Sequence, residues 1–213
     1  MTRAAISPEL VGSPACWDAL CDDTGCGVCV IGANGRLEFV NDQVAGDTGR
    51  PASTLIGELY AAVLPEQTRN ERTLLVKKAF ESPEPIVAVG MLRGTLHRTI
   101  YRRVEGIEPK VLVIDRPAIG VDNGPRPSIK MRDEDAGVLA KLTARELDVL
   151  RLIGMGLSTA DIAKSLHRSV KTIEWHRVSL GNKLNVANRV ELARIAIRAG
   201  VVPLEDVEPD TTD

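Results

Sequence analysis

Four helix-start signals follow one another at short intervals near the C-terminal end of the chain. In Thr143-Ala-Arg-Glu146, a threonine is followed three residues later by a glutamate, and each side chain can satisfy a backbone donor of the other. Ser158, Ser169 and Asn188 precede three further segments with helical apolar spacing. Helices this short cannot bury their apolar faces alone. The pattern therefore predicts a compact all-α, four-helix domain over residues 138–203.

The second and third of these helices are separated by only about three residues. This spacing is typical of a helix-turn-helix, whose second helix enters the major groove of double-stranded DNA. Here the second helix is VKTIEWHRVSLGNKL, and its apolar positions 173, 180 and 184 are expected to face inward. The side chains then expected on its outer face are Lys171, Glu174, Trp175 and Val178.

Charge is distributed unevenly along the chain. Residues 141–200 carry eleven Lys or Arg and five Asp or Glu, a net of +6, whereas the remaining residues carry a net of −8. A basic module joined to an acidic one indicates that only the C-terminal part meets a polyanion.

The C-terminal sequence contains an ordered set of motifs: LTxRExxVL, then G-x-S/T-x-x-x-I-A, then S-x-K-T-I/V-x-x-H, then K-L. With these motifs it resembles the LuxR/FixJ-type DNA-binding domain, without a gap. The resemblance implies phosphate contacts from Lys171, Thr172, His176, Arg177 and Lys183. It implies base-edge contacts from Glu174, Trp175 and Val178, and a dimer contact on the last helix, residues 190–199.

Several of these residues have alternative explanations. The two lysines could be solvated surface charges, and His176 and Arg177 could pack within the bundle. Glu174 either accepts a hydrogen bond from a cytosine amino group or pairs with a neighbouring cation. Trp175 either contacts DNA or belongs partly to the core. Gly181 either permits a close backbone approach or frays the helix end.

The N-terminal half has a mixed pattern. Apolar runs at 27–31 and 37–40 flank Asn34-Gly35, which favours a tight hairpin turn. Helical segments follow, the longest after Pro65, and strands are expected at 86–92, 95–104 and 110–114. The hairpin GVCVIGANGRLEFVN and the closing VLVIDRP resemble those of PAS domains. This implies an α+β domain at 14–116 with a five-stranded antiparallel sheet, which senses a signal or dimerises. An unidentified small ligand is compatible with it, and no cofactor is predicted.

The segment between these domains, residues 117–137, is expected to be a linker because its first half is rich in Pro and Gly. A short helix is compatible with residues 131–140.

All four cysteines of the chain, Cys16, Cys21, Cys26 and Cys29, lie within fourteen residues. Such a cluster could ligate zinc or an iron–sulfur centre, or act as a redox switch. A redox- or metal-responsive DNA-binding sensor is therefore the alternative function. Because Cys29 lies in an expected buried strand, we predict instead that the cysteines are structural and that no metal is bound.

The sequence also argues against several classes of protein. It contains no nucleophile–base pair, phosphate loop or metal signature of an enzyme, so we predict that it is not one. It lacks a signal peptide and a membrane-spanning stretch, which favours a cytoplasmic location. The expected partners are double-stranded DNA and a second copy of the chain, with RNA polymerase as a further candidate. The predicted function is sequence-specific transcription regulation.

Overall fold

The computed structural model describes residues 14–22, 24–118, 126–132 and 135–202. The chain forms two compact units. One contains the chain up to Ala88 together with Thr99–Arg116, and the other contains Val89–Arg98 and the chain from Pro117 onward. Residues 119–125 and 133–134 of the expected linker lie outside the described residues.

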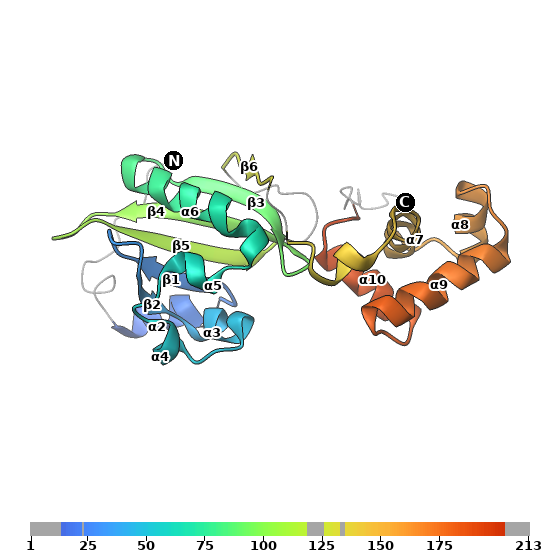
Figure 1. The fold of residues 1–213 in the computed structure, drawn as a ribbon, viewed down its shortest axis with the longest axis horizontal. Coiled ribbons are helices and arrows are strands. Elements are labelled where there is room, and N and C mark those ends of the chain that lie inside the picture. The colour runs from blue at the N-terminus through green and yellow to red at the C-terminus, as the bar shows by residue number, and fades with distance from the viewer. Residues whose placement is uncertain (1–13, 23, 119–125, 133–134, 203–213) are drawn as a thin grey trace, which may run out of the picture. The chain divides into compact units, whose positions relative to one another are not determined.

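The N-terminal part is the expected PAS-like α+β arrangement (Figure 1). The elements follow in the order α2 (Pro14–Asp22), β1 (Gly27–Ile31), β2 (Leu37–Val40), α3 (Asp42–Thr48), α4 (Ala52–Leu55), α5 (Tyr60–Val63), α6 (Glu66–Glu81), β3 (Ile86–Leu92), β4 (Thr95–Val104) and β5 (Lys110–Pro117). The five expected strands are all present, and β5 is longer than predicted.

The sheet has six strands rather than the predicted five, in the order β2-β1-β5-β4-β3-β6. The additional strand, β6 (Ile129–Lys130), comes from the segment expected to be linker. Next to it, the amide of Met131 donates to the carbonyl of Val89 at 2.8 Å. An edge strand presents unpaired backbone groups, and this segment satisfies some of those of β3.

Asn41 fixes the point at which the sheet passes into the helices. It is the N-cap of α3 and is only 4% exposed. Its side-chain oxygen accepts from the amides of Val28 at 2.9 Å and Val44 at 3.2 Å. Its side-chain nitrogen donates to the carbonyls of Cys21 and Cys26. One buried amide thus joins α2, β1 and α3.

The C-terminal part is the predicted four-helix domain, preceded by a 3₁₀ helix, η1 (Gly137–Lys141). Its helices are α7 (Ala144–Gly154), α8 (Thr159–Ser165), α9 (Val170–Leu184) and α10 (Arg189–Arg198). Its core is aliphatic, and Val149, Leu150, Ile162, Ile173 and Leu180 are completely buried within it. None of the described helices is long and apolar enough to span a membrane.

Candidate DNA-binding site

The four predicted caps set the ends of the helices that build the site. Thr143 and Glu146 form the complete capping box of α7. The side chains of Ser158, Ser169 and Asn188 each accept from the amide three residues later. Since an N-cap satisfies donors that the helix leaves free, these residues decide where α8, α9 and α10 begin.

Helix α9 has one buried and one exposed face. Ile173, Leu180 and Leu184 are buried, as the apolar spacing predicted. Opposite them lies a stripe that we call the outer face of α9, made up of Lys171, Glu174, Trp175 and Val178, all exposed. Trp175 is 66% and Val178 is 64% exposed. The side chains at these positions are therefore available to a partner.

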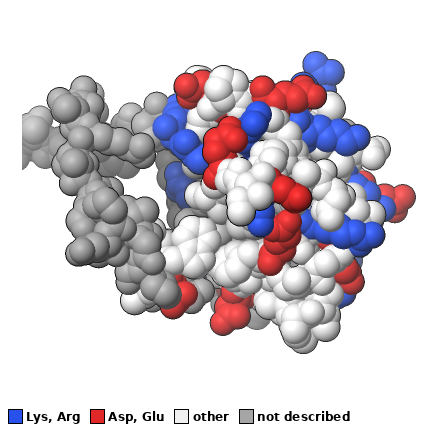
Figure 2. All heavy atoms as spheres, turned by 90° about the vertical axis from the view of Figure 1, so that its left-hand side faces the viewer, with Lys and Arg blue, Asp and Glu red and all other residues white. Residues whose placement is uncertain are grey.

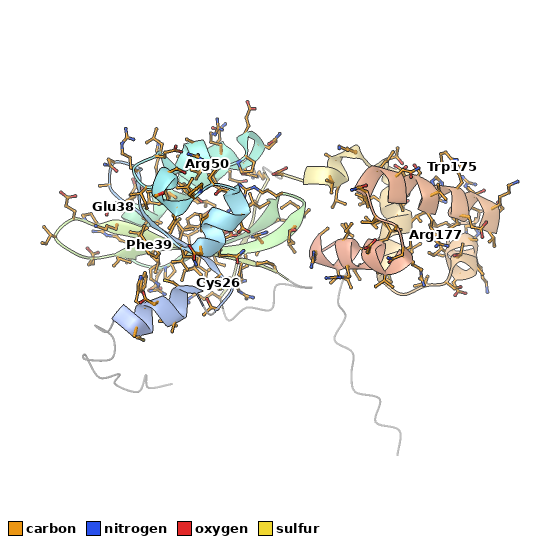
Figure 3. The ribbon with its side chains drawn as sticks, turned by 90° about the horizontal axis from the view of Figure 1, so that it is seen from below. Cys26, Glu38, Phe39, Arg50, Trp175 and Arg177 are labelled. Carbon is orange, nitrogen blue, oxygen red and sulfur yellow. The ribbon has the colours of Figure 1, made fainter. Side chains whose placement is uncertain are left out.

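The positions of Trp175 and Glu174 on this face bear on two of the open alternatives. Trp175 projects from α9 (Figure 3), and its ring meets that of His176 at a steep angle with a centroid distance of 5.2 Å. Because Trp175 is 66% exposed, it is not part of the core. Glu174 is exposed and makes no ion pair with any residue in the described ranges, so it is not neutralised by a neighbouring cation.

The other predicted residues of α9 are half-buried. Thr172 shares a 2.7 Å hydrogen bond with the cap residue Ser169. Arg177 is directed toward the neighbouring helices (Figure 3), where it lies 3.4 Å from the hydroxyl of Thr159. Nδ1 of His176 and Nε of Arg177 are buried without a hydrogen-bond partner among the described residues. These side chains sit at the border between the outer face and the bundle.

Lys183 is held by a buried carboxylate that the sequence indicated only as a cap. Its Nζ lies 2.6 Å from Oε2 of Glu146, and Glu146 also accepts from Ser179 at 2.7 Å. Glu146 is 3% exposed. The hydrogen bond from Lys183, followed by those from Ser179 and Thr143, lowers the pKa of Glu146 to about 2. The carboxylate that starts α7 therefore also anchors the last turns of α9.

A groove of about 570 Å³ runs between α9 and the start of α10. Glu174, Arg177 and Val178 line one side of it, and Asn188 and Arg189 line the other. Gly181 lies between the two sides, and a Cβ there would be 3.0 Å from the carbonyl oxygen of Val186. Because α9 continues to Leu184, Gly181 permits a close backbone approach and does not fray the helix.

Comparison with known proteins identifies this helical domain. Residues 140–196 match the family described as bacterial regulatory proteins, luxR family. The C-terminal domain belongs to the LuxR family. The match covers the capping box, the helix-turn-helix and most of α10.

Curated relatives of this LuxR-family domain are bacterial regulators. The chain is 43% identical over 61 residues to the uncharacterized response regulatory protein YgeK of Escherichia coli, which is 29% of this chain and 42% of that protein. It is 37% identical over 78 residues to the transcriptional regulatory protein FixJ of Azorhizobium caulinodans, 37% of each chain. The chain thus spans less than half the length of these relatives.

Solved structures with similar architecture have low sequence identity to this chain. Vibrio cholerae VqmA, described as a dimer without its target DNA, has a TM-score of 0.45 and 18% identity over 89% of this chain and 90% of that one. The PAS domain of an HTR-like protein from Haloarcula marismortui has a TM-score of 0.40 and 16% identity over 52% and 95%. Similarities at this level do not establish a function.

The described residues of the N-terminal domain carry charges of both signs on the face that Figure 2 shows, where Lys and Arg mix with Asp and Glu. Two exposed ion pairs, Arg50–Glu58 and Lys110–Glu38, neutralise cations of this domain. The outer face of α9 in the LuxR-family domain remains the strongest candidate interface.

The four cysteines differ in burial. Cys21 and Cys29 are buried, and Cys16 and Cys26 are half-buried. Burial, followed by the charge of Asp115, raises the pKa of Cys29 to about 12. Within the described ranges, no group of three or more His, Cys, Asp or Glu side chains is placed to hold a metal ion. No observation favours the redox or metal alternative.

Proposed function

We propose that the protein is a sequence-specific, DNA-binding transcription regulator that acts in the cytosol as a homodimer, without catalytic activity. The observation that carries the proposal is the outer face of α9, where the two apolar side chains Trp175 and Val178 are exposed on the second helix of a helix-turn-helix. Exposed apolar groups beside a basic residue suit thymine methyls and sugars in a major groove.

The proposed contacts divide into two sets. Glu174, Trp175 and Val178 would approach base edges, with Glu174 accepting from cytosine because no residue of the described chain pairs with it. Backbone phosphates would be bound by Lys171, Thr172, His176, Arg177 and Lys183. The Nζ of Lys183 can serve both Glu146 and a phosphate, since an ammonium group has three donors.

The roles that we propose for the parts of the chain follow the domain boundaries predicted from the sequence. Residues 14–116 sense or dimerise, 117–137 link, and 138–203 bind DNA, with a dimer contact on α10. A dimer of this kind would bind a pseudo-palindrome whose half-sites lie about 34 Å apart. RNA polymerase is the further partner that we propose for the bound dimer.

Selection of genomic fragments by the full-length protein tests the proposal. We expect a small set of fragments sharing a pseudo-palindrome to be enriched. Lys171→Ala should weaken binding to all fragments alike and reduce the salt slope by about one. Trp175→Ala should reduce the enrichment itself. Lys78→Ala, an exposed lysine on α6, is the matched control and should change neither. Binding without any enriched sequence would contradict a regulator of this kind.

A further inference from the structure

Helix α9 extends beyond the last residue of its outer face, and Asn182 in this extension is exposed. Because successive residues of an α-helix are rotated by about 100°, Asn182 lies about 40° from Val178 and about 20° from Trp175 around the helix. The three buried positions of α9 lie about 160–180° from it. Asn182 is therefore on the same side of the helix as the outer face, opposite the core.

Asn182 is the third member of a row along this side of α9. Glu174, Val178 and Asn182 follow one another at intervals of four residues, so they are neighbours on the helix surface. Each interval advances about 6 Å along the helix axis, and successive bases of a DNA strand are about 3.4 Å apart. If Glu174 and Val178 approach base edges as proposed above, Asn182 lies about two base pairs further along.

The backbone around Asn182 is held in place. Leu180 and Leu184, on either side of it in the sequence, are buried in the core. Its neighbour Lys183 is bound to the buried carboxylate of Glu146 at 2.6 Å. A binding residue on a fixed backbone loses less conformational entropy when it meets its partner, because only its own side chain has to be ordered.

The side chain of Asn182, in contrast, is available for binding. Among the residues that the structure describes, none forms a hydrogen bond with its amide. It also borders the groove between α9 and α10, so open space adjoins it on that side. Both hydrogen-bonding groups of the amide can therefore meet a partner that approaches the outer face of α9.

The amide of Asn182 supplies chemistry that the outer face lacks. A lysine ammonium and a tryptophan indole only donate hydrogen bonds, a carboxylate only accepts them, and a valine side chain does neither. An asparagine amide donates and accepts side by side in one plane. In the major groove, adenine presents the matching pair, an acceptor at N7 beside a donor at N6.

We propose that Asn182 is a further specificity-determining residue, which reads an adenine in the major groove with its amide nitrogen donating to N7 and its amide oxygen accepting from the N6 amino group. The inference rests on the function proposed above and adds a base preference to it. A phosphate contact is the competing role for an asparagine at this place. The base is favoured because Asn182 lies opposite the core, on the side directed to the base edges, whereas the phosphates border the groove.

Selection from a library of randomised DNA duplexes, followed by sequencing, tests this with the full-length protein. We expect the wild type to prefer adenine at one position of each half-site, by about tenfold over the other bases. Asn182→Ala should reduce this preference to less than about twofold and leave the other positions unchanged. Asn182→Gln should retain it, since glutamine carries the same amide. Asn70→Ala, which removes an exposed asparagine from α6, is the matched control and should change no position.

The melting temperature separates folding from recognition. Because Asn182 has no hydrogen-bond partner in the described structure and alanine favours helices, Asn182→Ala should not melt below the wild type. If Asn182→Ala weakens binding to every sequence alike, or selects the same sequences as the wild type, the inference is overturned. A wild type that enriches no sequence contradicts the proposed regulator itself, so the two failures are distinguishable.

Discussion

Nζ of Lys183, in the last turn of α9, lies 2.6 Å from Oε2 of Glu146, in the first turn of α7. Glu146 is almost fully buried and also accepts from Ser179 and from the backbone amide of Thr143. The proposed recognition helix is thus fixed to the start of α7 by one carboxylate. Its orientation depends on this ion pair as well as on apolar packing.

Removing the ammonium group of Lys183 should therefore lower the stability of the C-terminal domain even when no DNA is present. We expect Lys183→Ala to lower the free energy of unfolding of the C-terminal domain by about 1–3 kcal/mol, because Glu146 loses a charged partner. Lys164→Ala, which removes an exposed lysine from α8, is the matched control and should change stability by no more than about 0.5 kcal/mol. Urea denaturation followed by circular dichroism measures both.

The same variant separates two roles of Lys183. If its ammonium also binds a phosphate, Lys183→Ala measured where it is fully folded should still show a weaker salt dependence of DNA binding. An unchanged salt slope in folded protein would restrict Lys183 to its structural role.

The pH dependence of stability provides a second prediction. Because the pKa of Glu146 is about 2 when folded and about 4.3 in an unfolded chain, its contribution is complete above the unfolded value and is lost as the pH falls toward 2. We expect wild-type protein to lose more stability between pH 5 and pH 2 than Glu146→Gln does. Parallel denaturation curves for the two proteins across this range would argue against the assigned carboxylate.

Local signals were sufficient to predict most of the fold. Each N-cap bonds a backbone amide only three residues away, so a short stretch of sequence is enough to predict it. This holds for Thr143, Ser158, Ser169 and Asn188. The bond between Glu146 and Lys183 joins positions 37 residues apart, and no local pattern indicates such a partner. The DNA contacts themselves stay a prediction.

In the N-terminal domain, too, features without a local sequence pattern were not predicted. Its five strands follow from apolar runs and a hairpin turn, whereas β6 was missed because a two-residue strand has no periodicity of its own. Arg72 was missed for a different reason. In the highly charged helix α6 it resembles a surface residue, but the fold buries it to 1% exposure, where it donates to Thr99.

Replacing two helical glycines with alanine should change the stability of the protein in opposite directions. At Gly154, near the end of α7, a Cβ would be 2.4 Å from Val202 and 2.7 Å from Ala196, so Gly154→Ala should destabilise by about 1–3 kcal/mol through overpacking. At Gly46, in α3, a Cβ would meet no atom within 4 Å, so Gly46→Ala should stabilise by about 0.5–1 kcal/mol. Thermal denaturation of the two variants checks the signs. A stabilising Gly154→Ala would contradict the close packing of α7 against α10.

The cysteines provide the last prediction, which bears on the redox alternative. In native protein at pH 8, iodoacetamide should modify the half-buried Cys16 and Cys26 and leave Cys21 and Cys29 intact until the protein is unfolded. The reason is twofold for Cys29, which is 5% exposed and, with a pKa of about 12, carries almost no thiolate at this pH. Mass spectrometry of digested samples assigns the modified thiols. If oxidation abolished DNA binding while Cys29 stayed intact, the result would support a redox switch based on the two half-buried thiols. If oxidant did not change DNA binding, the result would support a structural role for the cysteines.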